Sequence, residues 1–123
     1  MQFREDNSGN KYVYFECSSK LSIVAMNLTK RFTDVKYFIG HSTFAETAKK
    51  EINGKVSLRC NENFDVSLVA QKHGGNGHKQ ASGIELPIDT FYELRKGNLH
   101  LIWVENIKIK KSRVIIVILK IIW

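Results

Sequence analysis

The residues best suited to chemistry lie in one glycine-rich run, Gly74-Gly75-Asn76-Gly77-His78. Glycine lets the backbone take positive φ and lets a ligand approach the main chain closely. Successive N–H groups in such a turn form a nest that binds anions, and a neighbouring histidine or arginine adds donors to phosphate oxygens. The glycines alone fit a plain turn as well as a phosphate-binding loop. The run matches neither the P-loop pattern nor the dinucleotide-binding pattern.

Two further segments precede this run and must position it. Ser57-Leu58-Arg59-Cys60 ends an alternating stretch that is typical of a strand. Asp65-Val66-Ser67-Leu68-Val69-Ala70 is typical of an amphipathic helix with a capping residue at its start. The glycine run then continues as Lys79-Gln80-Ala81-Ser82-Gly83. Arg59 therefore ends a strand, a helix follows, and that helix ends in the glycine turn that carries His78.

These three linked segments resemble the signature of the DHH-associated domain, the C-terminal substrate-binding domain of DHH phosphoesterases. That family includes RecJ-like exonucleases, nanoRNases that degrade short oligonucleotides, and cyclic-dinucleotide phosphodiesterases. Its pattern is S-[LIV]-R-S in a strand, D-V-x-x-[IL]-A in a helix, and then G-G-G-G-H-x-x-A-[AS]-G. The resemblance covers about residues 10–97. Within it, Asn76 replaces a glycine and Cys60 replaces a serine.

The resemblance implies that the chain binds the phosphate-bearing part of a substrate. Asparagine tolerates positive φ better than most residues, so we expect the turn to survive at Asn76, with the side chain intruding near the ligand. Residues 78–82 are also candidates for a helical turn whose free N–H groups would help to bind phosphate. The implied substrate-binding residues are Arg59, Gly74, Gly75, Asn76, Gly77, His78 and Ser82.

In the family, the metal ions and the nucleophilic water belong to a separate Asp-His-His domain. This sequence has neither that motif nor an Asp-rich replacement, and metal-assisted hydrolysis needs several converging ligands. We therefore predict no catalytic residue, metal ligand or cofactor in this chain, with Mn²⁺ or Mg²⁺ only in a separate catalytic domain. The sequence thus predicts a nucleotide or nucleic-acid phosphate-binding module. Two other functions stay open: a complete small phosphodiesterase acting on short oligonucleotides, and a degenerate structural or dimerisation domain.

The expected partners follow from the same comparison. They are a nucleotide or short single-stranded nucleic acid, a DHH catalytic domain in cis or in trans, and a second copy of the chain in a homodimer. No membrane contact is expected. Outside the motif, we expect His41 and His100 at the surface and His73 at the end of a helix, where it meets the helix dipole.

The pattern of apolar residues predicts alternating strands and helices, which favour an α/β fold. We expect one layered domain with a mixed β-sheet packed against α-helices. The expected strands are residues 12–15, 35–39 (closed by Gly40), 55–60 and 81–86 (stopped by Pro87). The expected helices are residues 20–32 after a Ser18 or Ser19 cap, a short one within 43–51 before an Asn53-Gly54 turn, one from Asn63 or Asp65 to Gly74, and one from Asp89 through Leu94 to Gly97.

Composition and charge are those of an ordinary globular domain with an unusual end. The chain has 123 residues, of which 43% are hydrophobic and 25% charged, and its net charge is +7. Residues 106–123 hold five Lys or Arg and no acid, so the net charge says little about the glycine run. We predict a substrate-binding-like domain over residues 1–97 and a basic, isoleucine-rich extension over 98–123, with strands packed on the domain or in a dimer contact. Two free cysteines and no leader-like start favour the cytoplasm.

Overall fold

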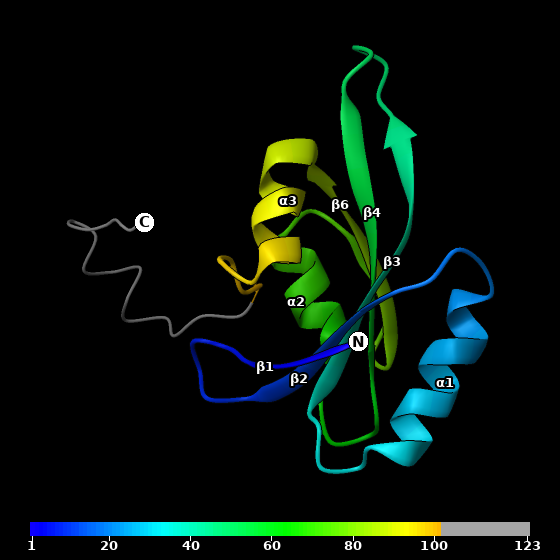
Figure 1. Ribbon diagram of the computed structural model, residues 1–123, viewed down its shortest axis with the longest axis vertical. Coiled ribbons are helices and arrows are strands. Elements are labelled where there is room, and N and C mark those ends of the chain that lie inside the picture. Colours follow the sequence, from blue (N-terminus) through cyan, green and yellow to red (C-terminus); the bar gives the residue numbers. More distant parts are fainter. Residues whose placement is uncertain (102–123) are drawn as a thin grey trace.

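A six-stranded mixed sheet organises residues 1–101, the part of the chain that the computed structural model describes (Figure 1). The strand order is β1-β2-β3-β4-β6-β5, and only the β2–β3 pair is parallel. The predicted α/β class is confirmed. The strands are β1 Gln2–Glu5, β2 Lys11–Glu16, β3 Tyr37–Glu46, β4 Ile52–Cys60, β5 Asn76–His78 and β6 Ala81–Pro87. The helices are α1 Leu21–Arg31, α2 Val66–Lys72 and α3 Ile88–Lys96.

Helices cover both faces of this sheet, α1 on one and α2 with α3 on the other (Figure 1). Side chains of a strand alternate between faces, so Tyr12 and Tyr14 pack into the core under α2 and α3, whereas Val13 and Phe15 pack under α1. All four are buried, which explains why this strand is apolar without alternation. We call the two sides the α1 face and the α2–α3 face.

Several elements match their sequence signals closely. Asp65 caps α2, since its side chain accepts a hydrogen bond from Ser67 N at 2.9 Å. Val66, Val69 and Ala70 are buried on one side of that helix. Gly97 ends α3 in the left-handed conformation, with φ 88°, as expected of a glycine that follows a helix.

Residues 43–51 were expected to form a helix and instead complete a β-hairpin. β3 does not stop at Gly40 but runs on to Glu46, and Asn53-Gly54 is part of β4 rather than a turn. The turn lies at Thr47, whose hydroxyl oxygen accepts a hydrogen bond from Glu51 N at 3.1 Å. Close packing explains the glycines at positions 40 and 54. A Cβ on Gly40 would lie 2.5 Å from the Phe15 ring, and a Cβ on Gly54 would lie 2.6 Å from the Phe91 ring.

The starts of α1 and α3 and two short edge strands, β1 and β5, also differ from what the sequence predicts. Neither Ser18 nor Ser19 caps α1, because Lys20 holds that position in the left-handed region at φ 57°. Asp89 lies in the first turn of α3, and Pro87 is at its N-cap. The strands β1 and β5 are short and exposed, and no sequence pattern indicated them.

Further expectations concern the chain's end and the membrane. Of the predicted extension, Asn98 to Leu101 are described and Leu101 is buried in the core under α2 and α3; residues 102–123 lie outside the described part, and so does their predicted strand structure. No helix within residues 1–101 is long and apolar enough to cross a membrane.

Candidate functional site

The glycine run forms the outer strand of a hairpin at the edge of the sheet. In the β5–β6 ladder, Asn76 lies opposite Gly83, Gly77 opposite Ser82, and His78 opposite Ala81. Residues 78–82 therefore contain a tight turn between two strands, and the helical turn expected there is wrong. Gly74 and Gly77 have positive φ, at 80° and 149°. Asn76 does not, so the expectation that its asparagine adapts to a left-handed position is also wrong.

The first two glycines shape the loop rather than expose an anion nest. Gly74 N donates to Gln71 O at 3.2 Å and Gly75 N donates to Ala70 O at 2.8 Å, which satisfies the last carbonyls of α2. A Cβ on Gly75 would lie 2.1 Å from Gly83 O, so the loop packs directly on the β6 backbone. The N–H groups of Gly74 and Gly75 are therefore not free to bind an anion.

The ladder register brings those side chains onto one face. Directly opposite residues in an antiparallel pair point to the same side. Arg59 lies opposite Ala81, which lies opposite His78; Ser57 lies opposite Gly83, which lies opposite Asn76. Both rows are on the α1 face, because Arg59 also pairs with Phe38, which packs under α1.

The result is a shallow trough with a floor of small residues. We define the β6 trough as Ala81 and Gly83 on the floor, flanked by Ser57 and Arg59 of β4 and by Asn76 and His78 of β5. Adjacent strands lie about 4.8 Å apart, so the two flanks stand about 10 Å from each other. A pocket of about 490 Å³ opens at the Gly83 end. Its lining is Lys55, Val56, Ser57, Gly74, Gly75, Asn76, Gly83, Ile84 and Glu85.

Arg59 is half-buried, and not all of its guanidinium donors have a hydrogen-bond partner among the described residues. Its Nη2 donates to the Ser22 hydroxyl at 3.2 Å, in the first turn of α1. Its Nε is shielded from solvent and has no hydrogen-bond partner among the described residues. Within residues 1–101 it forms no ion pair with Glu62 or Asp65; Asp65 caps α2 instead. A shielded, unpaired donor costs about 1–3 kcal/mol, and more when charged.

His78 and Ser82 have different positions, although the same motif contains both. The His78 residue is exposed on the trough. Ser82 is buried, with 7% of its surface exposed, and pairs with Gly77 on the opposite face. Its hydroxyl donates to His78 O at 2.7 Å. This bond braces the hairpin beside His78.

Cys60 also supports the hairpin. Its thiol donates to Phe64 O at 3.2 Å and to Lys79 O at 3.3 Å, and burial raises the pKa of that thiol. Cys17 and Cys60 are both free, as expected. No group of three or more candidate metal ligands occurs in the described residues.

The sequence interpretation missed Ser57 and Lys55, although a signal for them exists. Both lie on the same side of β4 as Arg59, because side chains two residues apart in a strand share a face. Ser57 flanks the trough and Lys55 lines the pocket. The strand assignment alone was sufficient to add them to the candidate residues.

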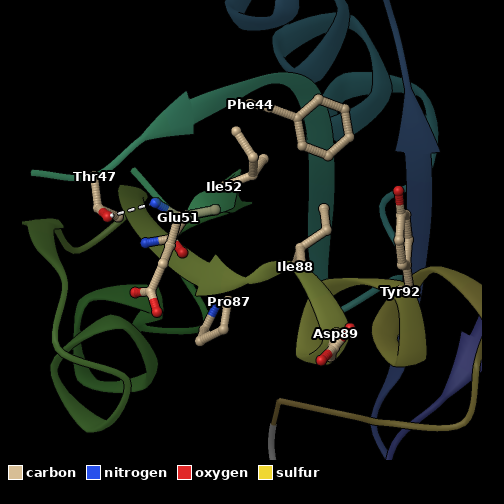
Figure 2. A pocket seen from close by; sticks show the side chains of 9 residues that line it. Phe44, Thr47, Glu51, Ile52, Pro87, Ile88, Asp89 and Tyr92 are labelled. Atoms are coloured by element: carbon tan, nitrogen blue, oxygen red, sulfur yellow. Dashed lines mark hydrogen bonds between the residues drawn. The ribbon is translucent and has the colours of Figure 1, made fainter. Parts of the chain in front are cut away.

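A larger hollow lies on the other face, at the end of the β3–β4 hairpin beside α3 (Figure 2). Its volume is about 740 Å³. Figure 2 shows Phe44, Ile52, Ile88 and Tyr92 around the opening, with the carboxylates of Glu51 and Asp89 at its rim. The lining is completed by Thr47, Asn53 and Pro87. We call it the hairpin hollow; the sequence did not indicate it, because a helix was expected over 43–51.

A polar cluster stands at the end of the parallel β2–β3 ladder, where Glu16 lies opposite His41. Arg95 Nε lies 2.8 Å from Glu16 Oε2, and the Tyr14 hydroxyl donates to the same oxygen at 2.6 Å. Burial opposes ionisation of Glu16, but these hydrogen bonds outweigh it and lower the pKa of the carboxyl. His41 was expected at the surface and is buried, with 5% exposed. Burial lowers the pKa of its ring.

The two remaining histidines also make tertiary contacts. His100 Nδ1 lies 2.7 Å from the Tyr12 hydroxyl, and burial lowers the pKa of its ring. His100 is therefore half-buried rather than a free surface residue. His73 is the C-cap of α2, the end of a helix as expected, and its Nε2 lies 3.0 Å from Leu101 O.

Comparison with known proteins gives a likeness of fold. No family model and no curated protein matches the sequence. Among the solved structures that do match is an uncharacterized protein from Helicobacter pylori G27, with 25% identity and a TM-score of 0.53 over 76% of this chain. Another is the pGpG-specific phosphodiesterase PggH from Vibrio cholerae, with 15% identity and a TM-score of 0.41 over 57% of this chain. This chain spans only 26% and 24% of their respective lengths.

Proposed function

We propose that the β6 trough binds a phosphate group of a nucleotide or of a short single-stranded nucleic acid. The observation that carries this proposal is the register that places Arg59 and His78 on one face, two strands apart across small residues. Charge-assisted hydrogen bonds from such groups are about twice as strong as neutral ones. Lys79 follows in the hairpin turn and adds a further positive charge.

The proposal extends to the chain as a substrate-binding module of a DHH-type phosphoesterase. Its support is the resemblance over the strand, helix and glycine run, together with the placement of Arg59 and His78 on one face. The metal ions, Mn²⁺ or Mg²⁺, and the hydrolytic water would then belong to a separate catalytic domain in cis or in trans. The two free thiols fit a reducing compartment, the cytoplasm.

A titration with inorganic phosphate and nucleoside monophosphates, followed by NMR of the full chain, tests the proposal. One small open site buries little surface, so we expect dissociation constants between about 1 μM and 1 mM. The amides of Ser57, Arg59 and residues 76–78 should shift, and Arg59→Ala should weaken the binding. Shifts confined to the hairpin hollow or to residues 106–123 would place binding elsewhere and overturn the proposal.

A hydrolysis assay separates the module from a complete phosphodiesterase. The full chain with a short oligonucleotide and Mn²⁺ or Mg²⁺ should release no product. Hydrolysis that is lost in both Arg59→Ala and His78→Ala would instead support catalysis by this chain at the same site. Binding without hydrolysis is the result that the module predicts.

A further inference from the structure

We infer that Asn76 makes the β6 trough selective for an adenine nucleotide, by reading the edge of the base while Arg59 and His78 hold the phosphate. This inference rests on the proposed function and names the substrate class of the same site. Its first support is that the backbone gives no reason for asparagine at this position. Asn76 starts β5 outside the positive-φ region, and asparagine is a poor strand former.

The second support is the space in front of the side chain. Asn76 is exposed, lies opposite Gly83 and points to the α1 face. Gly83 has no positive φ, and a Cβ added there would come no closer than 3.8 Å to another atom, Val56 O. The fold therefore has room for a side chain at Gly83 and leaves that room empty. The gap between Asn76 and Ser57 is about 10 Å wide, two strand spacings, and the pocket opens there.

The charges along the trough orient a nucleotide within it. Arg59 and His78 form one row, and Lys79 follows in the adjacent turn. The row beyond Asn76 and Ser57 contains Lys55 opposite Glu85, whose charges offset each other. An anionic phosphate is therefore favoured at the Arg59 row. The uncharged base is then directed to the Asn76 row, two residues further along the strands.

The chemistry of the carboxamide names the base. It presents a donor and an acceptor side by side in one plane, which matches the N6 and N7 atoms of adenine in a bidentate contact. The Asn76 carboxamide has no hydrogen-bond partner within residues 1–101, so it is available to a ligand. The Ser57 hydroxyl stands on the other side of the gap and can contact the sugar.

Affinities of the full chain for AMP, GMP, CMP, UMP and inorganic phosphate test this inference by isothermal titration. We expect AMP to bind about fivefold more tightly than the other three nucleotides, the lower limit for one bidentate base contact. Asn76→Gly should abolish this preference and leave the affinity for inorganic phosphate unchanged. Asn76→Asp, of nearly equal size but acceptor only when ionised, should also lose it. As a matched control, Asn63→Gly changes an exposed asparagine in the turn before α2 and should keep the preference.

The outcomes separate this inference from the proposed function. Equal affinities for the four nucleotides in the unaltered chain, or an AMP preference that persists in Asn76→Gly, would overturn the adenine assignment and leave the phosphate site standing. Failure of all five ligands to bind would overturn the phosphate site itself. A preference for a different base that disappears in Asn76→Gly would also contradict the adenine assignment.

Discussion

The β6 trough and the hairpin hollow use the same two strands, β4 and β6, on opposite faces of the sheet. The trough is floored by Ala81 and Gly83 and edged by polar side chains. The hollow is edged by Phe44, Ile52 and Tyr92, each more than two-fifths exposed. By volume the hollow is larger, about 740 Å³ against about 490 Å³. Size alone would therefore favour the region whose lining contains no positively charged side chain.

The difference teaches that empty space has two origins in this fold. At the hollow, apolar side chains that also serve the core leave a gap between a hairpin and a helix; Phe44 packs edge-on against Phe91, at 5.5 Å between ring centroids. At the trough, the gap exists because Gly83 has no side chain where one would fit. The comparison predicts that changes at the hollow alter stability, whereas changes at the trough alter binding.

The largest effect is expected at Gly75, a residue of the trough pocket that serves the fold. In Gly75→Ala the new methyl group would overlap Gly83 O, a backbone atom that cannot move without moving β6. Overpacking of this kind costs about 1–3 kcal/mol, and we expect the upper part of that range. Urea denaturation measures the loss as a lower unfolding midpoint. A midpoint equal to that of the unaltered chain would show that the loop does not pack on β6 in this way.

Gly83→Ala is the matched control, because it adds the same methyl group in open space. Its free energy of unfolding should stay within about 0.5 kcal/mol of that of the unaltered chain, as for most surface changes. Nucleotide binding should weaken nevertheless, since the methyl group fills the floor of the trough. The two alanines thus separate a glycine needed for folding from one needed for a ligand.

Arg59→Ala should weaken phosphate binding by about tenfold or more, because a hydrogen bond to a charged group contributes about 1.5–3 kcal/mol. Arg59→Lys should restore part of this affinity, since it keeps the charge but not the planar guanidinium. Lys55→Ala, which removes a charge one row beyond Ser57, should change the affinity less. Equal losses in the two alanine variants would indicate a general effect of charge rather than contact with Arg59.

The fold was predictable wherever local signals and tertiary packing agree. The alternation of residues 55–60, the Asp65 cap and the glycine after α3 each specify their element from a few neighbouring residues. The helix expected over residues 43–51 is wrong because non-local pairing outweighs the helix propensity of these residues. The β3–β4 ladder runs from the Tyr37–Cys60 pair to the Glu46–Ile52 pair. Phe44 also packs against Phe91 of α3. Strand propensity depends on such packing more than on the backbone.

For the candidate site, the sequence indicates residue types but not their geometry. The motif names Arg59 and His78 as candidates, and the register places them in one row. It did not show that Gly74 N and Gly75 N are already bonded to α2, or that Ser82 points to the other face. Those facts depend on β5 being a strand, and three residues that include a glycine carry too little periodicity to indicate one.

Phe44→Ala tests the hollow from its own side. The edge-on contact with Phe91 and the contact with His41, at 4.7 Å between centroids, would be lost. Aromatic pairs contribute about 0.5–1.5 kcal/mol beyond their burial, so we expect stability to fall by about 1 kcal/mol and nucleotide affinity to stay unchanged. A weaker affinity with an unchanged unfolding midpoint would assign a binding role to the hollow and reverse the comparison.

The smallest effect is a pH dependence that begins at His41, beneath Phe44 and against Phe91. Burial lowers the pKa of this ring in the folded state, so the unfolded chain binds the proton first as pH falls. Stability is therefore fully present above the ordinary pKa of about 6.5 and declines below it, with a slope of at most about 1.4 kcal/mol per pH unit for one proton. The facing charges are Glu16, which favours protonation, and Arg95, which opposes it. Burial lowers the pKa of the His100 ring as well, so His41→Gln should flatten only part of the decline between pH 6.5 and 5. Urea denaturation at each pH measures this decline. An unchanged decline in His41→Gln would place the responsible proton on another group.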